Sequence, residues 1–405
     1  MKPWIEMSAM DSRLCFVGAC LRAEAAVSEL CLRHGISRKT GYKWLERYRL
    51  EGAAGLVERS RARHTQSPVI DSETAEILRC LRARRPTWGP RKLLARLALD
   101  HPQRDWPCAS TVGDLLRREG LSQPRRKPIR EPGTKQPQIA PAAANDSWAA
   151  DFKGWFRTGD GVRCEPFTVT DGYSRYILAC EAVPQVSAEK VQPILTRLFQ
   201  AHGLPHALRT DNGSPFAHRL GLGGLSRLSV WLLKLGIWPD RIAPGRPDQN
   251  GCHERMHRTL NEEAATPRAA NLPDQQARME AWRQDYNCNR PHEALGQVCP
   301  ATLWQPSSRP WPVTIPVWDY PPDHWVQRVN TKGYIIWRDV PLYLTEALRG
   351  ETVALAQRDD GDWAIRFRAF DLAVWGEAAN AVRRSGLART ASPRRDAHVL
   401  ADRPA

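Results

Sequence analysis

The sequence predicts a multidomain chain, with helical units first, a mixed α/β domain in the centre and a small all-β domain towards the end. Three observations predict this order. Positive charge gathers in the first third, strand and helix patterns alternate between residues 146 and 308, and short strand-like runs follow from Trp325. With 405 residues and 42% hydrophobic content, the chain is long enough for several domains that each bury a core.

The net charge of +15 is concentrated in the first part of the chain. Residues 1–145 hold 27 Lys and Arg against 15 Asp and Glu, a surplus of 12. A solvated basic face on one helix would not place most of the excess in a third of the chain. The distribution therefore favours a polyanion as the partner of this region.

Membrane insertion, secretion and a structural zinc site are all disfavoured. No apolar run approaches the roughly 18 residues that a membrane span needs. The first residues, Met1 to Glu6, lack the long apolar region of a signal peptide. The ten cysteines include no Cys-x-x-Cys pair, which favours reduced thiols. We therefore expect a cytoplasmic protein.

Residues 1–66 are expected to form a first helix-turn-helix DNA-binding domain. Residues 25–34 carry apolar side chains at helical spacing, Gly35 interrupts them, and Ser37 caps a second helix over residues 38–48. The outward cations of this second helix are the candidate contacts to phosphates and base edges: Arg38, Lys39 and Lys43. A helical hairpin that binds another protein is the alternative.

Residues 67–123 are expected to form a second helix-turn-helix domain. Its helices are predicted to start near Asp71, at Trp88-Gly89-Pro90 and at Ser110-Thr111. We interpret Trp88 as a core anchor rather than a base-stacking residue. Ser110 and Thr111 are interpreted as the cap of the third helix and as further candidates for DNA contact.

Three carboxylates lie on three separate elements of the central domain. Asp151 falls in a strand-like run, Asp211 at the end of another, and Glu254 on a helix that Asp248 can cap. Carboxylates held by rigid elements are suitable ligands for Mg²⁺. Asp171 belongs to an Asp-Gly hairpin turn, so we do not count it as a ligand.

Each acid also has a local explanation that needs no metal. Asp211 precedes Asn212-Gly213 and can close a turn, Glu254 can pair with Arg258 four residues on, and Asp151 can be a strand-edge charge. These alternatives weaken when the three acids are considered together with the motifs around them.

Five motifs follow one another between residues 146 and 308. They are Trp148-x-x-Asp151-Phe152, Thr170-Asp171-Gly172-Tyr173-Ser174-Arg175, Thr210-Asp211-Asn212-Gly213, Gln249-Asn250-Gly251-x-x-Glu254-Arg255 and Tyr286 to Leu295. In this order they resemble the integrase core of DDE insertion-sequence transposases, relatives of retroviral integrases with a ribonuclease-H-like fold. The helix-turn-helix units resemble those of the same transposases. The last β segments resemble the small SH3-like barrel that follows some integrase cores.

The resemblance implies a DNA transposase, a polynucleotidyl transferase that cleaves transposon ends and joins the 3′ hydroxyl to target DNA. It implies that Asp151, Asp211 and Glu254 hold two Mg²⁺ ions, with Mn²⁺ as a substitute and Asp151 as the bridging ligand. Double-stranded DNA is the implied partner of a homo-oligomer associated with the nucleoid.

The Glu254 helix departs from the resemblance at one position. Asn261 stands where related cores usually carry a Lys or Arg seven residues beyond the Glu. Arg258 lies four residues after Glu254 on nearly the same helix face, so we assign it as the substitute cation that contacts DNA. Arg255 is the further candidate contact on this helix.

The remaining assignments complete the domain order. Residues 124–145 are predicted as a basic Pro-rich linker, 309–380 as the small β-barrel domain and 381–405 as a disordered tail. The 42 residues between Asp211 and Glu254 exceed the family's usual gap, so residues 216–235 are interpreted as an insertion that lengthens a surface segment.

Two other functions are considered. A catalytically inactive repressor of transposition would need DNA binding alone, and retention of all three acids speaks against it. An unspecific ribonuclease-H-like nuclease would not need the helix-turn-helix units.

Overall fold

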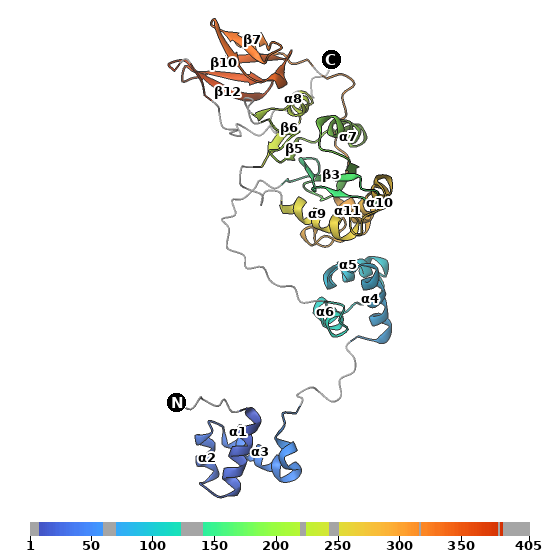
Figure 1. The fold of residues 1–405 in the computed structure, drawn as a ribbon, viewed down its shortest axis with the longest axis vertical. Helices are drawn as coiled ribbons and strands as arrows, with labels where there is room; N and C mark the ends of the chain where they lie inside the picture. Colours follow the sequence, from blue (N-terminus) through green and yellow to red (C-terminus); the bar gives the residue numbers. More distant parts are fainter. Residues whose placement is uncertain are drawn as a thin grey trace. The chain divides into compact units, whose positions relative to one another are not determined.

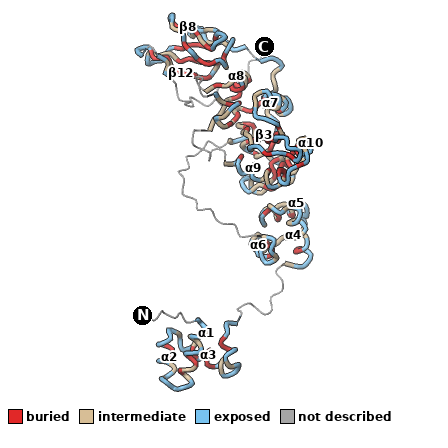
Figure 2. The backbone as a smooth tube through the Cα atoms, viewed as in Figure 1, coloured by how far each residue is buried: buried red, intermediate tan, exposed pale blue. Residues whose placement is uncertain are grey.

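The computed structural model describes residues 8–59, 70–122, 141–218, 224–242, 251–315, 317–379 and 381–383. The chain divides into two compact units, with the boundary after Asp71 (Figure 1). Buried residues gather in the interior of each unit (Figure 2). Within the described ranges no helix is long and apolar enough to cross a membrane. Asp248, most of the predicted linker and most of the predicted tail lie outside these ranges.

The first unit contains α1 (Ala9–Leu21), α2 (Val27–Arg33) and α3 (Arg38–Glu51). Gly35 adopts a φ of +62° between α2 and α3, and the Ser37 side chain accepts the Thr40 N–H at 3.2 Å. The predicted interruption and cap are thus confirmed. At Gly41 a Cβ would lie 2.4 Å from Cys31 Sγ, so α2 and α3 pack too closely there for a larger residue. The apolar core of the unit draws on every helix: Phe16, Val17, Leu30, Cys31, Trp44, Leu45 and Leu56.

The second unit begins with three helices, α4 (Ser72–Arg84), α5 (Pro90–Asp100) and α6 (Ala109–Arg118). Trp88 is 1% exposed, which confirms its interpretation as a core anchor. The predicted cap of α6 is wrong: Cys108 is the N-cap, and no side chain caps this helix end. Because Ala109 is already helical, Ser110 and Thr111 fall inside the first turn. Their hydroxyl oxygens lie 3.0 Å from Cys108 Sγ.

The central domain is built on a mixed six-stranded sheet, as predicted. The strands are β1 (Ser147–Phe152), β2 (Phe156–Arg157), β3 (Arg163–Asp171), β4 (Ile177–Val183), β5 (Ala207–Thr210) and β6 (Trp238–Arg241). β3 pairs antiparallel with β1, β2 and β4, whereas β1, β5 and β6 are parallel neighbours. The parallel part needs helical crossovers, which α7 (Ala188–His202) and α8 (Arg227–Lys234) supply.

Asp171 occupies the turn after β3, where the sequence placed it. Its Oδ1 accepts the Asn145 N–H at 2.8 Å, and its Oδ2 accepts both the N–H and the hydroxyl of Ser174 at 2.7 Å. Burial raises the pKa of this carboxyl, and these donors oppose the rise. The carboxylate therefore has the local structural use that the hairpin motif indicates.

Two apolar clusters cover the two faces of the sheet. The first joins the sheet to α7 and α8 through buried residues that include Trp148, Phe167, Val169, Val191, Leu195, Phe199, Leu208, Leu228 and Leu232. The second joins it to α9 (Gly251–Glu263) and α10 (Leu272–Asn289) through Ile177, Cys180, Met256, Leu260, Met279, Trp282 and Tyr286. Neighbouring residues of β3 and β4 fall into different clusters because successive strand side chains point to opposite faces.

The sequence pattern predicts a helix over residues 274–287, capped by Asp274 and packed through Met279, Trp282 and Tyr286. Helix α10 starts earlier, at Leu272. Asn271 is its N-cap and accepts the Asp274 N–H at 2.9 Å, so the predicted capping role of Asp274 is wrong. Pro273 fits the first turn, where its missing N–H has no partner to lose. The predicted packing residues Met279, Trp282 and Tyr286 are all buried.

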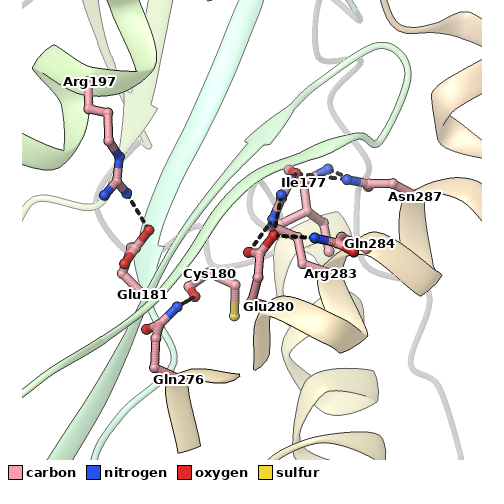
Figure 3. A network of polar contacts seen from close by, with 9 residues as sticks. All are labelled: Ile177, Cys180, Glu181, Arg197, Gln276, Glu280, Arg283, Gln284 and Asn287. Carbon is pink, nitrogen blue, oxygen red and sulfur yellow. Dashed lines mark hydrogen bonds and ion pairs between the residues drawn. The ribbon is translucent and has the colours of Figure 1, made fainter. Parts of the chain in front are cut away.

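Two amide side chains of α10 bond the open edge of β4, which pairs with β3 alone among the described strands (Figure 3). Asn287 accepts the Ile177 N–H at 2.8 Å and donates to the Ile177 carbonyl at 2.9 Å. Gln276 accepts the Ala182 N–H at 2.6 Å and donates to the Cys180 carbonyl at 3.1 Å. The helix thus satisfies backbone groups that a further strand would otherwise bond.

We expect Asn287→Ala to lower the free energy of unfolding by about 1–3 kcal/mol, because it leaves the buried Ile177 N–H without its acceptor. Arg283 still donates to the Ile177 carbonyl at 3.0 Å, so only the N–H is orphaned. Chemical denaturation measures the change. Gln284→Ala, an exposed position on the same helix, is the control. Equal stability of the two variants would contradict the edge-capping role.

Helix α8 corrects the interpretation of residues 216–235 as a surface insertion. Leu228 and Leu232 lie in the cluster under the sheet, whereas Val230 and Leu233 lie in the apolar cluster of the C-terminal β domain. Lys234 also forms an ion pair of 2.6 Å with Glu351. Helix α8 is therefore a buried crossover that joins two domains. Its sequence is apolar because one face packs against the sheet and the other against the C-terminal β domain.

The C-terminal domain is all-β, as predicted. Its strands are β7 (Trp325–Arg328), β8 (Tyr334–Trp337), β9 (Val340–Tyr343), β10 (Thr352–Gln357), β11 (Trp363–Phe367), β12 (Phe370–Gly376) and β13 (Ala381–Arg383). The sheet order is β13-β12-β11-β10-β7, and β8 and β9 form a separate hairpin. No pairing between described strands closes this sheet, so the predicted SH3-like barrel is not confirmed.

Polar contacts join the α4–α5 region to the central domain within the second unit. Arg85 donates from both terminal nitrogens to Asp285 at 2.5 Å, and Thr87 donates to Glu263. Arg91 pairs with Glu293 at 2.9 Å. Burial, together with the charge of Arg290, lowers the pKa of Lys92 to about 8. Part of the positive charge of the second helical group is therefore engaged by core acids.

Candidate active site

Asp151 lies in β1, and Asp211 directly follows the end of β5, the parallel neighbour of β1. The register between these strands pairs Trp148 with Leu208 and Ala149 with Arg209, and each aspartate lies two residues beyond that last pair. Trp148 and Leu208 face the α7–α8 side of the sheet. By alternation, Asp151 faces the opposite side, where α9 lies.

Both aspartates are half-buried and make short-range backbone contacts. Asp151 Oδ1 accepts the Phe152 N–H at 2.8 Å, and Asp211 Oδ1 accepts the Gly213 N–H at 3.2 Å. A Cβ at Gly213 would lie 2.9 Å from Asp211 Oδ2, so glycine at this position keeps the carboxylate uncrowded. Asp211 thus makes the predicted turn-closing contact, and it does so through Oδ1.

Glu254 lies in the first turn of α9 and is exposed. In this structure the described residues contain no group of three or more His, Cys, Asp or Glu side chains that could hold a metal ion. The described structure therefore does not bring Asp151, Asp211 and Glu254 together as one group of ligands. Among the described residues no ion pair joins Glu254 to Arg258, so the local explanation for Glu254 finds no support.

Two histidines next to Glu254 were not identified from the sequence. His253 Nε2 lies 2.6 Å and His257 Nε2 2.8 Å from Thr168 Oγ1. Thr168 is the β3 residue paired with Asp151, and its hydroxyl donates to the Asp151 carbonyl at 3.2 Å. The helix that carries Glu254 is thus bonded to the strand pair that carries Asp151.

A spacing signal could have identified this pair. The run His253-Glu254-Arg255-Met256-His257 places two histidines four residues apart, on one helix face. The same spacing occurs in helical zinc sites. Here both Nε2 atoms face one hydroxyl, and burial lowers the pKa of His253 well below its ordinary value and that of His257 to about 4. Both rings are therefore neutral at pH 7.

The candidate cations of α9, Arg255 and Arg258, are both exposed. Asn261 is half-buried and lies three residues further along the helix than Arg258. The exposed guanidinium groups are accessible to a polyanion that approaches Glu254.

The predicted DNA-binding residues of α3 are exposed. Arg38, Lys39 and Lys43 all face solvent, and Lys43 Nζ lies 4.0 Å from the centre of the Trp44 ring. Tyr42, 59% exposed on the same helix, is a further candidate that the charge pattern did not indicate. An exposed row of cations with a tyrosine suits phosphate and base contacts in a groove.

The predicted DNA-binding residues of α6 differ in accessibility. Ser110 is exposed, whereas Thr111 is half-buried. Their hydroxyls bond the Cys108 sulfur, which lowers the pKa of this thiol to about 7. Both side chains thus have a local partner at the start of the helix.

Models of four known domain families match the chain. Two integrase core domain models match residues 141–247 and 235–300. A helix-turn-helix domain model matches residues 12–64, and a homeodomain-like domain model matches residues 40–116. The two integrase matches together include Asp151, Asp211 and Glu254.

Similar proteins occur in insertion elements. An uncharacterized protein of the element IS407 from Burkholderia multivorans is 30% identical over 190 residues, which cover 46% of this chain and 65% of that protein. An uncharacterized protein of the element IS476 from Xanthomonas euvesicatoria is 29% identical over 178 residues, covering 44% and 49%. The chain thus spans about half to two thirds of the length of these relatives.

Two solved structures are similar at low identity. A chain of the simian T-cell lymphotropic virus intasome in complex with the PP2A regulatory subunit B56 gamma has 15% identity and a TM-score of 0.34, covering 72% of this chain and 91% of that one. The HTLV-2 integrase catalytic core domain in complex with magnesium has 13% identity and a TM-score of 0.29, covering 40% and 97%.

Proposed function

Because the chain belongs to the insertion-sequence transposases with an integrase-type core, we propose that it cleaves DNA at the ends of its element and joins the freed 3′ hydroxyl to target DNA. The observation that carries the proposal is that Asp151 in β1 and Asp211 at the end of β5 belong to adjacent parallel strands, within the segment matched by the integrase core model. Two carboxylates at neighbouring strands of a rigid sheet suit a site that holds divalent cations against a phosphodiester.

The donor set fits Mg²⁺, with Mn²⁺ as a substitute, because its ligands are hard carboxylate oxygens. Asp151 would contact both of two ions, and Asp211 and Glu254 would each hold one. Such ions activate the attacking oxygen, stabilise the leaving oxygen and neutralise charge on the phosphate. The chain's own contribution would be to hold the two aspartates at neighbouring strands and to carry Glu254 on α9.

The proposed reaction is two successive in-line substitutions at phosphorus. In the first, the oxygen of water forms a bond to phosphorus and the 3′ oxygen of the element leaves, taking a proton to become a hydroxyl. In the second, that hydroxyl attacks a target phosphodiester and displaces the target's own 3′ oxygen. One P–O bond forms for each that breaks, so joining needs no nucleotide cofactor and no covalent bond to the protein.

The helical units are proposed to recognise the element's ends. Residues 1–66 and 67–123 would each supply a DNA-binding domain, joined by residues 124–145 to the catalytic domain of residues 146–308. Arg38, Lys39 and Lys43 would contact DNA from the first domain, and Ser110 and Thr111 from the second. Transposition joins two ends, so the active species is proposed to be a homo-oligomer assembled on double-stranded DNA.

An oligonucleotide that carries the element's own terminal repeat tests the proposal. The full chain is incubated with it and with Mg²⁺, in the presence of target DNA, and cleaved and joined strands are separated on a denaturing gel. Mg²⁺-dependent cleavage followed by joining supports the proposal. Binding without cleavage would favour the inactive repressor, and cleavage without joining would favour a nuclease.

We expect Arg258→Ala to lower the rate of end cleavage by roughly tenfold or more, because one charge-assisted contact to a phosphate is lost. Asn261→Ala is the matched substitution on the same helix, and it should leave the rate within about twofold of wild type. Single-turnover cleavage with protein in excess over DNA measures both. Equal rates for the two variants would remove Arg258 as the substitute cation.

A further inference from the structure

One hydroxyl group connects α9 to the sheet at the level of Asp151. Thr168 Oγ1 lies within hydrogen-bond distance of His253 Nε2, His257 Nε2 and the Asp151 carbonyl, at 2.6, 2.8 and 3.2 Å. Thr168 is fully buried and His253 is 3% exposed. The two imidazole rings meet edge to face, with their centroids 4.7 Å apart.

Counting the available protons gives the donor and the acceptor of each hydrogen bond around Thr168. A hydroxyl has one proton and two lone pairs, so Thr168, which donates to the Asp151 carbonyl, accepts from both imidazoles. Each ring is then neutral with its proton on Nε2. His253 Nδ1 is left as an acceptor, and the Thr170 hydroxyl lies 3.3 Å from it as the donor. The donors and acceptors match without a charged group.

In this arrangement the two histidines have no direct role in the chemistry. Their Nε2 atoms both face Thr168, so these atoms are not available to a metal ion or a substrate. The hydrogen bonds act through geometry, because they determine the position of α9 relative to β1 and β3.

We propose that Thr168, His253 and His257 form a clamp that positions Glu254 relative to Asp151, and that this clamp determines how well the acids bind Mg²⁺. The proposal rests on the proposed transposase function. The three are positioning residues, because none of them is expected to touch DNA or metal.

The other described contacts of this helix with the sheet leave its position less defined. Met256 and Leu260 pack against the sheet as apolar side chains, and apolar contact is not directional. Hydrogen bonds are directional, so two of them to one fixed oxygen restrict the rotation and sliding of α9. Glu254 follows His253 directly in the chain, and the main-chain carbonyl of Asp151 accepts the hydrogen bond that the Thr168 hydroxyl donates. A displaced helix therefore moves Glu254 relative to Asp151.

The variants Thr168→Val and Thr168→Ser separate the clamp from simple packing. Valine keeps the shape of threonine and removes the hydroxyl, whereas serine keeps the hydroxyl. With the full chain and the terminal-repeat DNA, we expect Thr168→Val to raise the Mg²⁺ concentration for half-maximal cleavage by about 10–100-fold. We expect kcat at saturating Mg²⁺ to fall less, and KM for DNA to stay within about twofold. Thr168→Ser should restore most of the Mg²⁺ response.

Thr158→Val controls for the general loss of a buried hydroxyl. Thr158 is 4% exposed, and its hydroxyl bonds Asp160 and Val162 rather than α9. It should leave the Mg²⁺ requirement unchanged. The proposal is wrong if Thr168→Val has a normal Mg²⁺ requirement, or if Thr158→Val raises it equally.

A measurement without catalysis keeps the clamp distinct from the proposed function. Nitrogen NMR of ¹⁵N-histidine-labelled full chain at pH 7 should show His253 and His257 neutral with the proton on Nε2, and Thr168→Val should change both signals. Protons on Nδ1, or charged rings, would overturn the clamp even in an active enzyme. If the wild-type chain shows these signals yet never cleaves the terminal repeat, the proposed function fails while the hydrogen-bond assignment stands.

Discussion

Asp151→Asn, Asp211→Asn and Glu254→Gln are each expected to lower end cleavage and strand joining by at least about a thousandfold, while end binding stays close to wild type. Each substitution keeps the size of the side chain and removes the negative charge that holds Mg²⁺. The amide oxygen of Asn can still accept the backbone N–H groups that Asp151 and Asp211 accept now. The loss is therefore expected in catalysis rather than in folding.

Reaction of labelled terminal-repeat DNA measures end cleavage and strand joining, and a gel-shift titration in Ca²⁺ measures end binding. Glu262→Gln is the matched control, because Glu262 is an exposed acid on the same helix as Glu254. It should cleave normally. Near-normal cleavage by any one of the three variants would remove that residue from the catalytic set, and loss of end binding in all three would indicate that the acids support folding instead.

The joint replacement of Arg38, Lys39 and Lys43 by Ala is expected to cause the second-largest effect. Each cation that neutralises a phosphate releases counterions, so the triple variant should lose about one unit of slope in the plot of log affinity against log salt for each contact removed. At about 0.1 M salt we expect end binding to weaken by roughly a hundredfold or more. Fluorescence anisotropy across a salt series measures both quantities.

A charge-matched triple variant makes this test specific. Arg22, Arg33 and Arg59 belong to the same unit but pair with Glu24, Glu29 and Glu51. Their joint replacement by Ala changes the net charge by the same amount and leaves α3 intact. It should lower affinity far less. Equal losses in the two variants, or binding that does not respond to salt, would point to a protein-binding role for this helical unit.

The pattern of local signals was enough to predict the order of domains and the type of most elements. Helical spacing with Gly35 and Ser37 predicted the first pair of helices, and the Asp171-Gly172 turn predicted the β3–β4 connection, because these effects act within a few residues. Cap positions were less predictable. Asn271 and Cys108 are the N-caps where Asp274 and Ser110 were expected, since several neighbouring polar residues satisfy the same sequence rule.

The three acids show what local sequence patterns do not predict, which is how distant segments pair. The sequence placed Asp151 and Asp211 on strands, but only the parallel pairing of β1 with β5 makes these strands neighbours, because pairing is decided between segments far apart in the chain. The alternation of β1 then turns Asp151 towards α9. The sequence also named Glu254, although the described structure does not group it with the two aspartates.

The sequence by itself determined the domain order, the helix-turn-helix elements, the mixed sheet and the residues that make up the candidate site. Only the tertiary structure decided that α8 is a crossover buried on two faces, that the α4–α5 region meets core acids, and that His253 and His257 share the hydroxyl of Thr168. The physical reason is the range of the interactions. Propensity, capping and turn chemistry act between near neighbours, whereas burial and directional hydrogen bonds depend on which distant segments come together.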